Sequence, residues 1–475
     1  MAGPFEHIPM DGGGSADLYL LRYDDQGRLR SPEAAAEVRA RVQDPGDVTD
    51  VFCFAHGWNN VFAQALDRYR GFATGFVTQG AAFGIPKPAP YRPLLVGAVW
   101  PSTSFVMPWE AGPQIAADPD PFGRQAAEVE ELLELVTSSL EPARDQEFTE
   151  AVDGRRAVDA ATAERIAEIA IEALRAGPDP DDGSPPPQPE DLLEAWAALD
   201  ALARDGGAGA GGAPGSPPDG APGTPGDGAA GDPGAAPIGF GTIGDHPHEA
   251  QPGAAGLDFD PRDLLRMATV WKMKARAGTV GAHGLGPLVE HVLTHSAARL
   301  HLIGHSFGAR VVLSALTTAA APRPAHCVLL LQPAVNRWCF APHVAGTQRA
   351  GGFHGVLDKV TRPLMTTFSS HDAPLTRFFH LAMRGSHLGE PDFAGVGNTD
   401  LYGALGGFGP AGLTGLAVEE KAAVPGEGRY PLAGGARVIA VDGGVDINGL
   451  PAISGHGDIS NPVTWWALHD LTRPD

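Results

Sequence analysis

The chain has 475 residues, enough for one large domain with insertions or for two domains. Its net charge of −23 argues against a nucleic-acid partner, because phosphate binding requires clustered lysine and arginine. With 63 glycines and 44 prolines, part of the chain is expected to lie outside any packed core.

Residues 1–104 read as the first part of a core built of alternating strands and helices. Strands are expected over residues 16–22, 48–55 and 94–100, and helices over residues 33–42 and 61–78. This alternation favours a parallel sheet covered by helices. The second strand leads into His56-Gly57-Trp58, where the glycine lets the chain turn sharply and direct backbone N–H groups into the crevice at the strand's carboxyl end.

Residues 105–262 have a different character and are expected to form an insertion between two parts of the core. Amphipathic, acidic helices are expected over residues 126–140, 157–175 and 189–204. The tract 206–236 consists almost wholly of Gly, Ala, Pro, Asp and Ser, so it cannot bury enough apolar surface and is expected to be disordered. We expect the insertion to act as a cap over the crevice, and it offers a surface for a protein partner.

The second part of the core, residues 263–475, contains the most informative stretch. After helices over 264–276 and 286–296, an apolar strand leads into Gly304-His305-Ser306-Phe307-Gly308, and helical spacing follows through residue 316. A strand, a sharp turn and a helix place Ser306 at the tip of the turn, and the two flanking glycines let neighbouring backbone approach. This pattern indicates a nucleophile elbow.

Two further groups follow later strands. Strands are expected over residues 326–331, 364–370 and 437–441, with Asp372 just after the second and His456 in a loop after the last. A serine hydroxyl needs a base to take its proton, and a carboxylate orients that base. The carboxyl ends of parallel strands share one crevice, so we expect Ser306, His456 and Asp372 to form a catalytic triad. Backbone N–H groups of Trp58 and Phe307 are the candidate oxyanion hole.

These motifs resemble the α/β-hydrolase-fold serine hydrolases of the lipase and esterase type, including poorly characterised bacterial members. The resemblance rests on the His56-Gly57-Trp58 turn, the Ser306 motif, and the order serine, acid, histidine along the chain. It implies a doubly wound, mostly parallel sheet and cleavage of a carboxylic ester, either a lipid or a small acyl ester, or of a thioester, through an acyl-enzyme, with no cofactor and no metal. A catalytically silent scaffold that binds a partner through its insertion, and an acyltransferase or amidase with the same triad, remain alternatives.

Several assignments have rivals. Asp442 also ends a strand and Asp458 lies beside the histidine, but the family's order places the acid before the last strand, which favours Asp372. His56, Trp100 and Phe105 are the candidate substrate-binding residues, because pockets form at this edge of such sheets. Residues 385–435, expected to be a long loop, and the insertion are where substrate specificity is expected to lie.

Weaker signals are given structural interpretations. The run 245–249 holds metal-capable side chains in a loop, and the glycine-rich run 278–286 follows no strand and lacks a phosphate-loop lysine, so neither a zinc nor a nucleotide site is expected. Lys272, Lys274 and Arg276 form a basic stripe, interpreted as a face that meets the acidic insertion.

The compartment is inferred from the cysteines and from the absence of targeting patterns. The three cysteines, Cys53, Cys327 and Cys339, are expected to be buried free thiols of a reducing compartment. No secretory signal or membrane-spanning run is visible, so a soluble, cytoplasmic protein is expected.

Overall fold

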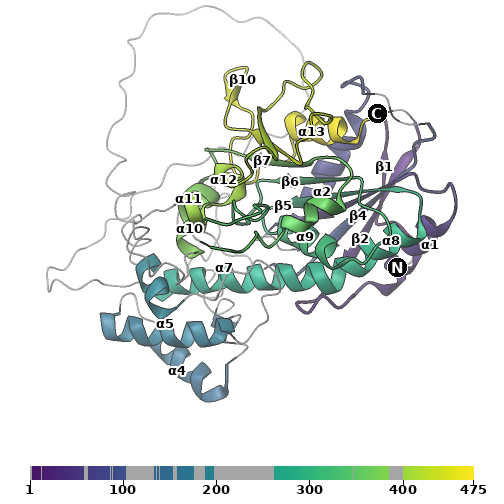
Figure 1. Cartoon of the computed structure of the whole chain (residues 1–475). Coiled ribbons are helices and arrows are strands. Elements are labelled where there is room, and N and C mark those ends of the chain that lie inside the picture. The colour runs from purple at the N-terminus through teal and green to yellow at the C-terminus, as the bar shows by residue number, and fades with distance from the viewer. Residues whose placement is uncertain are drawn as a thin grey trace, which may run out of the picture.

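The computed structural model describes residues 3–11, 13–57, 62–85, 87, 89–102, 133–134, 136–137, 140–152, 158–175, 188–196, 261–345, 347–383 and 399–474. Nine strands of this part form one sheet: β1 (Glu6–Pro9), β2 (Ser15–Arg22), β3 (Asp50–Ala55), β4 (Pro93–Val99), β5 (Arg299–His305), β6 (Cys327–Leu331), β7 (Leu364–Phe368), β8 (Ala417–Lys421) and β9 (Val438–Asp442). Their order is β1-β2-β4-β3-β5-β6-β7-β9-β8 (Figure 1). All neighbours are parallel except β1 and β2. The predicted α/β class with a mostly parallel sheet is confirmed.

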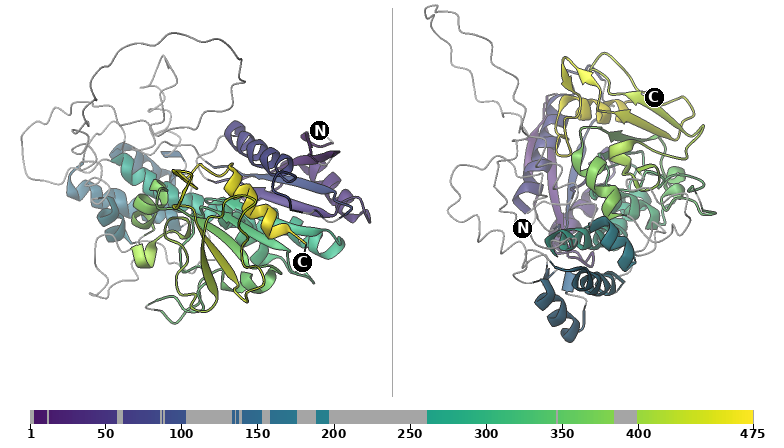
Figure 2. Two further views of the ribbon diagram at one scale, coloured as in Figure 1. Left: turned by 90° about the horizontal axis from the view of Figure 1, so that it is seen from above. Right: turned by 90° about the vertical axis from the view of Figure 1, so that its left-hand side faces the viewer.

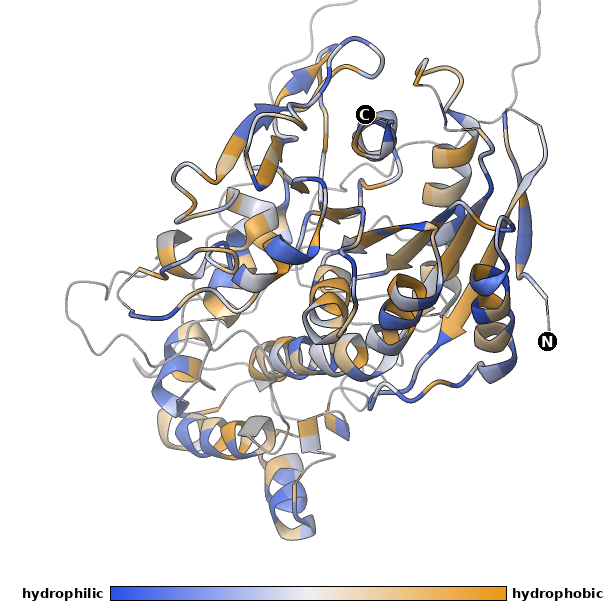
Figure 3. Cartoon of the chain, turned by 45° about the vertical axis from the view of Figure 1, so that its right-hand side comes forward, coloured by the Kyte–Doolittle hydropathy of each residue, from blue (hydrophilic) through white to orange (hydrophobic). Residues whose placement is uncertain are grey.

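Helices cover both faces of the sheet (Figure 2). The helices are α1 (Pro32–Gln43), α2 (Phe62–Thr78), α7 (Pro261–Thr279), α8 (Gly286–His295), α9 (Gly308–Thr318) and α13 (Pro462–Thr472). Along β3, Val51 and Cys53 pack in one core with α1, α7, α8 and α9, whereas Phe52 and Phe54 pack in a second core with α2 and α13. Every residue of β3 is buried, so its apolar run has no polar face. Figure 3 shows strands in the middle of the sheet coloured mainly hydrophobic between helices of mixed colour.

Part of the predicted insertion forms a helical layer outside α7 (Figure 1). Its elements are α4 (Pro142–Val152), α5 (Ala160–Arg175) and a helical run over residues 189–196. The buried face of α5 includes Ile166, Ile169 and Ala170, as its helical spacing predicts. The tract 206–236 and most of the helix expected over 126–140 lie outside the described residues.

The expectation of a loop over residues 385–435 is wrong in part, because β8 lies within this range, together with the short helices α11 (Thr399–Tyr402) and α12 (Leu405–Phe408). The sequence of β8, Ala-Val-Glu-Glu-Lys, lacks apolar alternation, and its residues are half-buried or exposed. It becomes a strand by pairing along the open edge of β9, which is a tertiary effect. Other short elements are η2 (His354–Lys359), η3 (Pro374–Phe378), α10 (Phe379–Ala382), β10 (Asp446–Ile447) and β11 (Leu450–Pro451). The glycine-rich run before α8 is a π-helix, η1 (Val280–Leu285).

The strand order creates a switch point between β3 and β5. After β3 the chain forms β4 on one side, and it later returns as β5 on the other side. In open α/β sheets, ligands bind in the crevice outside the carboxyl ends of the strands at such a point. Here those ends lead into His56 and into Ser306.

Candidate active site

Ser306 lies in a tight turn between β5 and α9. Its φ is +55°, in the left-handed region that non-glycine residues rarely adopt, and it is 3% exposed. The turn needs a glycine at 308, because a Cβ there would overlap the Ala55 carbonyl oxygen. Backbone bonds fix the geometry, since the Ser306 N–H donates to Leu331 O at 3.1 Å and the Ser306 carbonyl accepts from Ala334 N–H. The strain is therefore held by β3, β6 and the residues after β6.

His456 connects Ser306 to Asp372. Its Nε2 lies 2.9 Å from Ser306 Oγ, and its Nδ1 lies 2.8 Å from Asp372 Oδ2. Because the carboxylate accepts, Nδ1 carries the hydrogen, and in the neutral ring Nε2 accepts from the serine hydroxyl. The Asp372 side chain is fully buried, while His456 is 21% exposed. The structure thus brings together the three residues predicted for the triad, from the ends of β5, β7 and β9.

The rival acids have other partners. Asp442 Oδ1 accepts from the Gly444 N–H at 2.8 Å, within the turn after β9. Asp458 Oδ2 accepts from both the N–H and the hydroxyl of Ser454, at 2.9 Å each, and so closes the loop that carries His456. Of the three candidate acids, Asp372 is the one placed against the imidazole.

Gln332, which the sequence did not single out, and His305, for which a structural or hole-lining role was expected, hold the loop that carries His456. The buried Gln332 donates from Nε2 to the Gly455 carbonyl at 2.7 Å, and its backbone has a positive φ of 39°. His305 Nε2 lies 2.8 Å from the His456 carbonyl, so its ring donates from Nε2. The signal for Gln332 was a polar residue directly after a buried strand, the same signal that singled out Asp372.

His56 and Trp100 lie side by side at the ends of β3 and β4. The Trp100 indole donates to the His56 carbonyl at 3.0 Å, and the Trp100 N–H donates to His56 Nε2 at 3.2 Å. His56 Nδ1 lies 2.8 Å from the Gly57 carbonyl, so both ring nitrogens bind backbone groups. Burial lowers the pKa of His56 to about 4, so the ring is neutral. These contacts fix the turn into Gly57, whereas substrate binding by His56 and Trp100 stays a prediction.

Of the other predicted site residues, Phe307 lies within the described part of the chain. Phe307 is buried and directly precedes the first residue of α9. Trp58 and Phe105 lie outside the described residues, as does the metal-capable run 245–249. Across the described ranges, no group of three or more His, Cys, Asp or Glu side chains is arranged to hold a metal ion.

The structure also describes the cysteines and the basic stripe singled out in the sequence. The three cysteines are buried and free of disulfides, as expected. In the basic stripe, Lys274 Nζ lies 4.4 Å from the centre of the Trp271 ring, and Arg276 donates to the Pro101 carbonyl at 3.1 Å. Among the helices that the structure describes, none has the length and apolar character needed to cross a bilayer.

Comparison with protein-family models, curated proteins and solved structures finds no match to this chain.

Proposed function

We propose that this chain is a serine hydrolase of the α/β-hydrolase type that cleaves carboxylic esters through an acyl-enzyme on Ser306. The observation that carries the proposal is the hydrogen-bonded series Ser306–His456–Asp372, at 2.9 and 2.8 Å, at the carboxyl ends of strands in one sheet. The positive φ of the serine supports it, because a strained strand-to-helix turn is how such folds expose a nucleophile.

The chemistry follows from the geometry. As Ser306 Oγ attacks the ester carbonyl carbon, its proton passes to His456 Nε2, and Asp372 stabilises the imidazolium that forms. The tetrahedral intermediate then collapses, the C–O bond to the alcohol breaks, and His456 gives its proton to the leaving alkoxide. Water next attacks the acyl-enzyme while His456 takes its proton, and collapse releases the acid and restores the serine hydroxyl.

Negative charge on the carbonyl oxygen needs hydrogen-bond donors. The N–H of Phe307, at the start of α9, and that of Trp58, after the turn fixed by His56, are the proposed donors. A helix start favours negative charge, which supports the choice of Phe307. Removing one such donor typically raises the barrier by roughly 2.7–4 kcal/mol.

A fluorophosphonate probe tests the proposal on the full chain. We expect covalent modification of Ser306, found by peptide mass spectrometry, and none in Ser306→Ala. A panel of p-nitrophenyl esters and thioesters of increasing acyl length then identifies the substrate class. Labelling without hydrolysis, but with transfer of the acyl group to an added amine or alcohol, would replace hydrolase by acyltransferase. Absence of labelling in the folded chain would overturn the enzyme assignment and favour a scaffold.

A further inference from the structure

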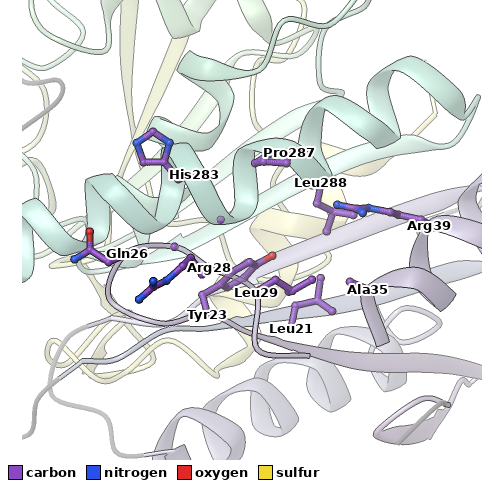
Figure 4. A pocket seen from close by; sticks show the side chains of 12 residues that line it. Leu21, Tyr23, Gln26, Arg28, Leu29, Ala35, Arg39, His283, Pro287 and Leu288 are labelled. Atoms are coloured by element: carbon purple, nitrogen blue, oxygen red, sulfur yellow. The ribbon is translucent and has the colours of Figure 1, made fainter. Parts of the chain in front are cut away.

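A cavity lies at the carboxyl end of β2, which is the third strand from β5 in the sheet order. It has a volume of about 340 Å³ and is enclosed by the turn after β2, by α1, and by η1 and α8 (Figure 4). None of its lining residues takes part in the contacts around Ser306. The cavity is therefore distinct from the candidate active site.

The walls of this cavity are apolar in part, and its polar lining includes Gln26, Arg28 and His283. Leu21, Leu29 and Leu288 line it from β2, from the turn and from α8, with Ala35 on α1. Its volume lies at the lower end of the roughly 300–1,000 Å³ that small-molecule sites occupy. The space suits a compact apolar body such as a medium-length alkyl chain or a single aromatic ring.

Tyr23 places a polar group in this space. The residue is 5% exposed, and its hydroxyl has no hydrogen-bond partner among the residues that the structure describes. Burial raises the pKa of Tyr23 above its usual value, so the hydroxyl keeps its proton and is a donor. The hydroxyl is therefore available to donate to a ligand acceptor in the cavity.

Arg39 supplies the charge. On the same helix, Arg41 forms ion pairs with Asp17 and Asp47 at 2.5 and 2.8 Å. Arg39 lines the cavity and forms no ion pair with any residue in the described ranges, and its buried Nε has no hydrogen-bond partner. The cavity thus contains an uncompensated cation in a chain whose net charge is −23.

We infer that this cavity binds a small organic carboxylate with an apolar body. The carboxylate pairs with the Arg39 guanidinium and accepts from the Tyr23 hydroxyl, and the apolar body packs against the three leucines. A guanidinium recognises a carboxylate through two parallel N–H···O bonds, which favours an acid over a neutral ligand of the same shape. The inference is independent of the chemistry proposed at Ser306.

Calorimetric titration of the full chain with sodium octanoate, and with neutral octanamide, tests the inference. We expect octanoate to bind more tightly than octanamide. Arg39→Gln should weaken octanoate binding by about tenfold to a hundredfold and leave octanamide binding unchanged, and Tyr23→Phe should weaken octanoate binding by about threefold to tenfold. Arg30→Gln is the matched control, because it removes one nearby positive charge from outside the cavity, where Arg30 pairs with Asp24.

Ala35→Leu is a second variant, which fills the cavity from α1 without changing any charge. It should abolish octanoate binding, so the test does not depend on the folding of Arg39→Gln, and thermal unfolding of each variant shows that it is folded. Octanoate bound at the Ser306 crevice would be insensitive to both variants. The inference is overturned if binding survives both substitutions, or if the unmodified chain binds no octanoate at millimolar concentration.

Discussion

Replacing Asp372 with asparagine should stabilise the unproductive tautomer of His456, in which Nε2 carries the hydrogen. In the structure, Asp372 Oδ2 faces His456 Nδ1 at 2.8 Å, while its Oδ1 accepts from the Leu375 N–H at 3.1 Å. An asparagine with its oxygen toward His456 would place its NH2 group against the Leu375 N–H in a fully buried position. Two facing donors there cost about 1–3 kcal/mol, so the opposite orientation is favoured. The NH2 group then faces Nδ1, which must accept, and Nε2 carries the hydrogen toward Ser306.

A base that already carries its proton on Nε2 cannot accept one from the serine. We expect kcat to fall by about 10⁴-fold, equivalent to about 5.5 kcal/mol of barrier. The assay is hydrolysis of a p-nitrophenyl ester, with the fluorophosphonate labelling rate as a second readout. Asp442→Asn is the matched control, because the hydrogen bond of the Asp442 side chain lies within its own turn, and it should change kcat little. The reasoning is refuted if Asp372→Asn remains folded with kcat within about tenfold of the unmodified chain, or if Asp442→Asn loses as much.

Three further predictions concern other parts of the site. Gln332→Leu removes the donor to the Gly455 carbonyl and should lower kcat about 10- to 100-fold at nearly unchanged KM; an unchanged kcat would show that the loop needs no such donor. Gly308→Ala should destabilise the fold by about 3 kcal/mol or more in urea denaturation, because its Cβ overlaps the Ala55 carbonyl, and an unshifted midpoint would disprove the overlap. The pKa of His56 is about 4 when folded and about 6.5 when unfolded, so the unfolded chain binds the proton first on acidification. Burial of neutral His56 therefore contributes about 3 kcal/mol to the free energy of unfolding above pH 6.5, and this contribution is lost as the pH falls toward about 4. A free energy of unfolding that stays constant across this window would contradict the prediction.

The parts of the fold that the sequence predicted are those determined by local patterns. The strand predicted over 48–55 forms as Asp50–Ala55 and is buried on both faces, and its apolar run is typical of the middle of a parallel sheet. Ser306 was identified because a glycine-flanked turn between a strand and a helix is itself a local signal. His456 and Asp372 were candidates because strand ends in a parallel sheet converge, and the chain order of the resembled family favoured them over their rivals.

The rest depends on contacts between distant segments. Gln332 and Gly455 are 123 residues apart, and His305 and His456 are 151 residues apart, so only the folded sheet reveals that these pairs are bonded. The strand at Ala417–Lys421 has a charged sequence without alternation and exists because β9 offers an open edge. The Arg39 cavity likewise joins residues of α1, the turn after β2 and α8, and nothing in the spacing of arginines on α1 distinguishes Arg39 from Arg41.

His56 and His305 lie beside the candidate triad, and burial keeps both rings neutral. Burial is the main cause that lowers the pKa of both His56 and His305, and it outweighs the hydrogen bond to a backbone carbonyl that raises the pKa of each ring, so both stay neutral. The rings of His305 and His456 lie only 4.9 Å apart. If His305 were charged, it would oppose an imidazolium at His456 by about 3 kcal/mol at an effective dielectric constant near 20. Keeping His305 desolvated therefore removes a repulsion at the step where His456 must accept the proton of Ser306, while its Nε2–H still holds the carbonyl of that residue.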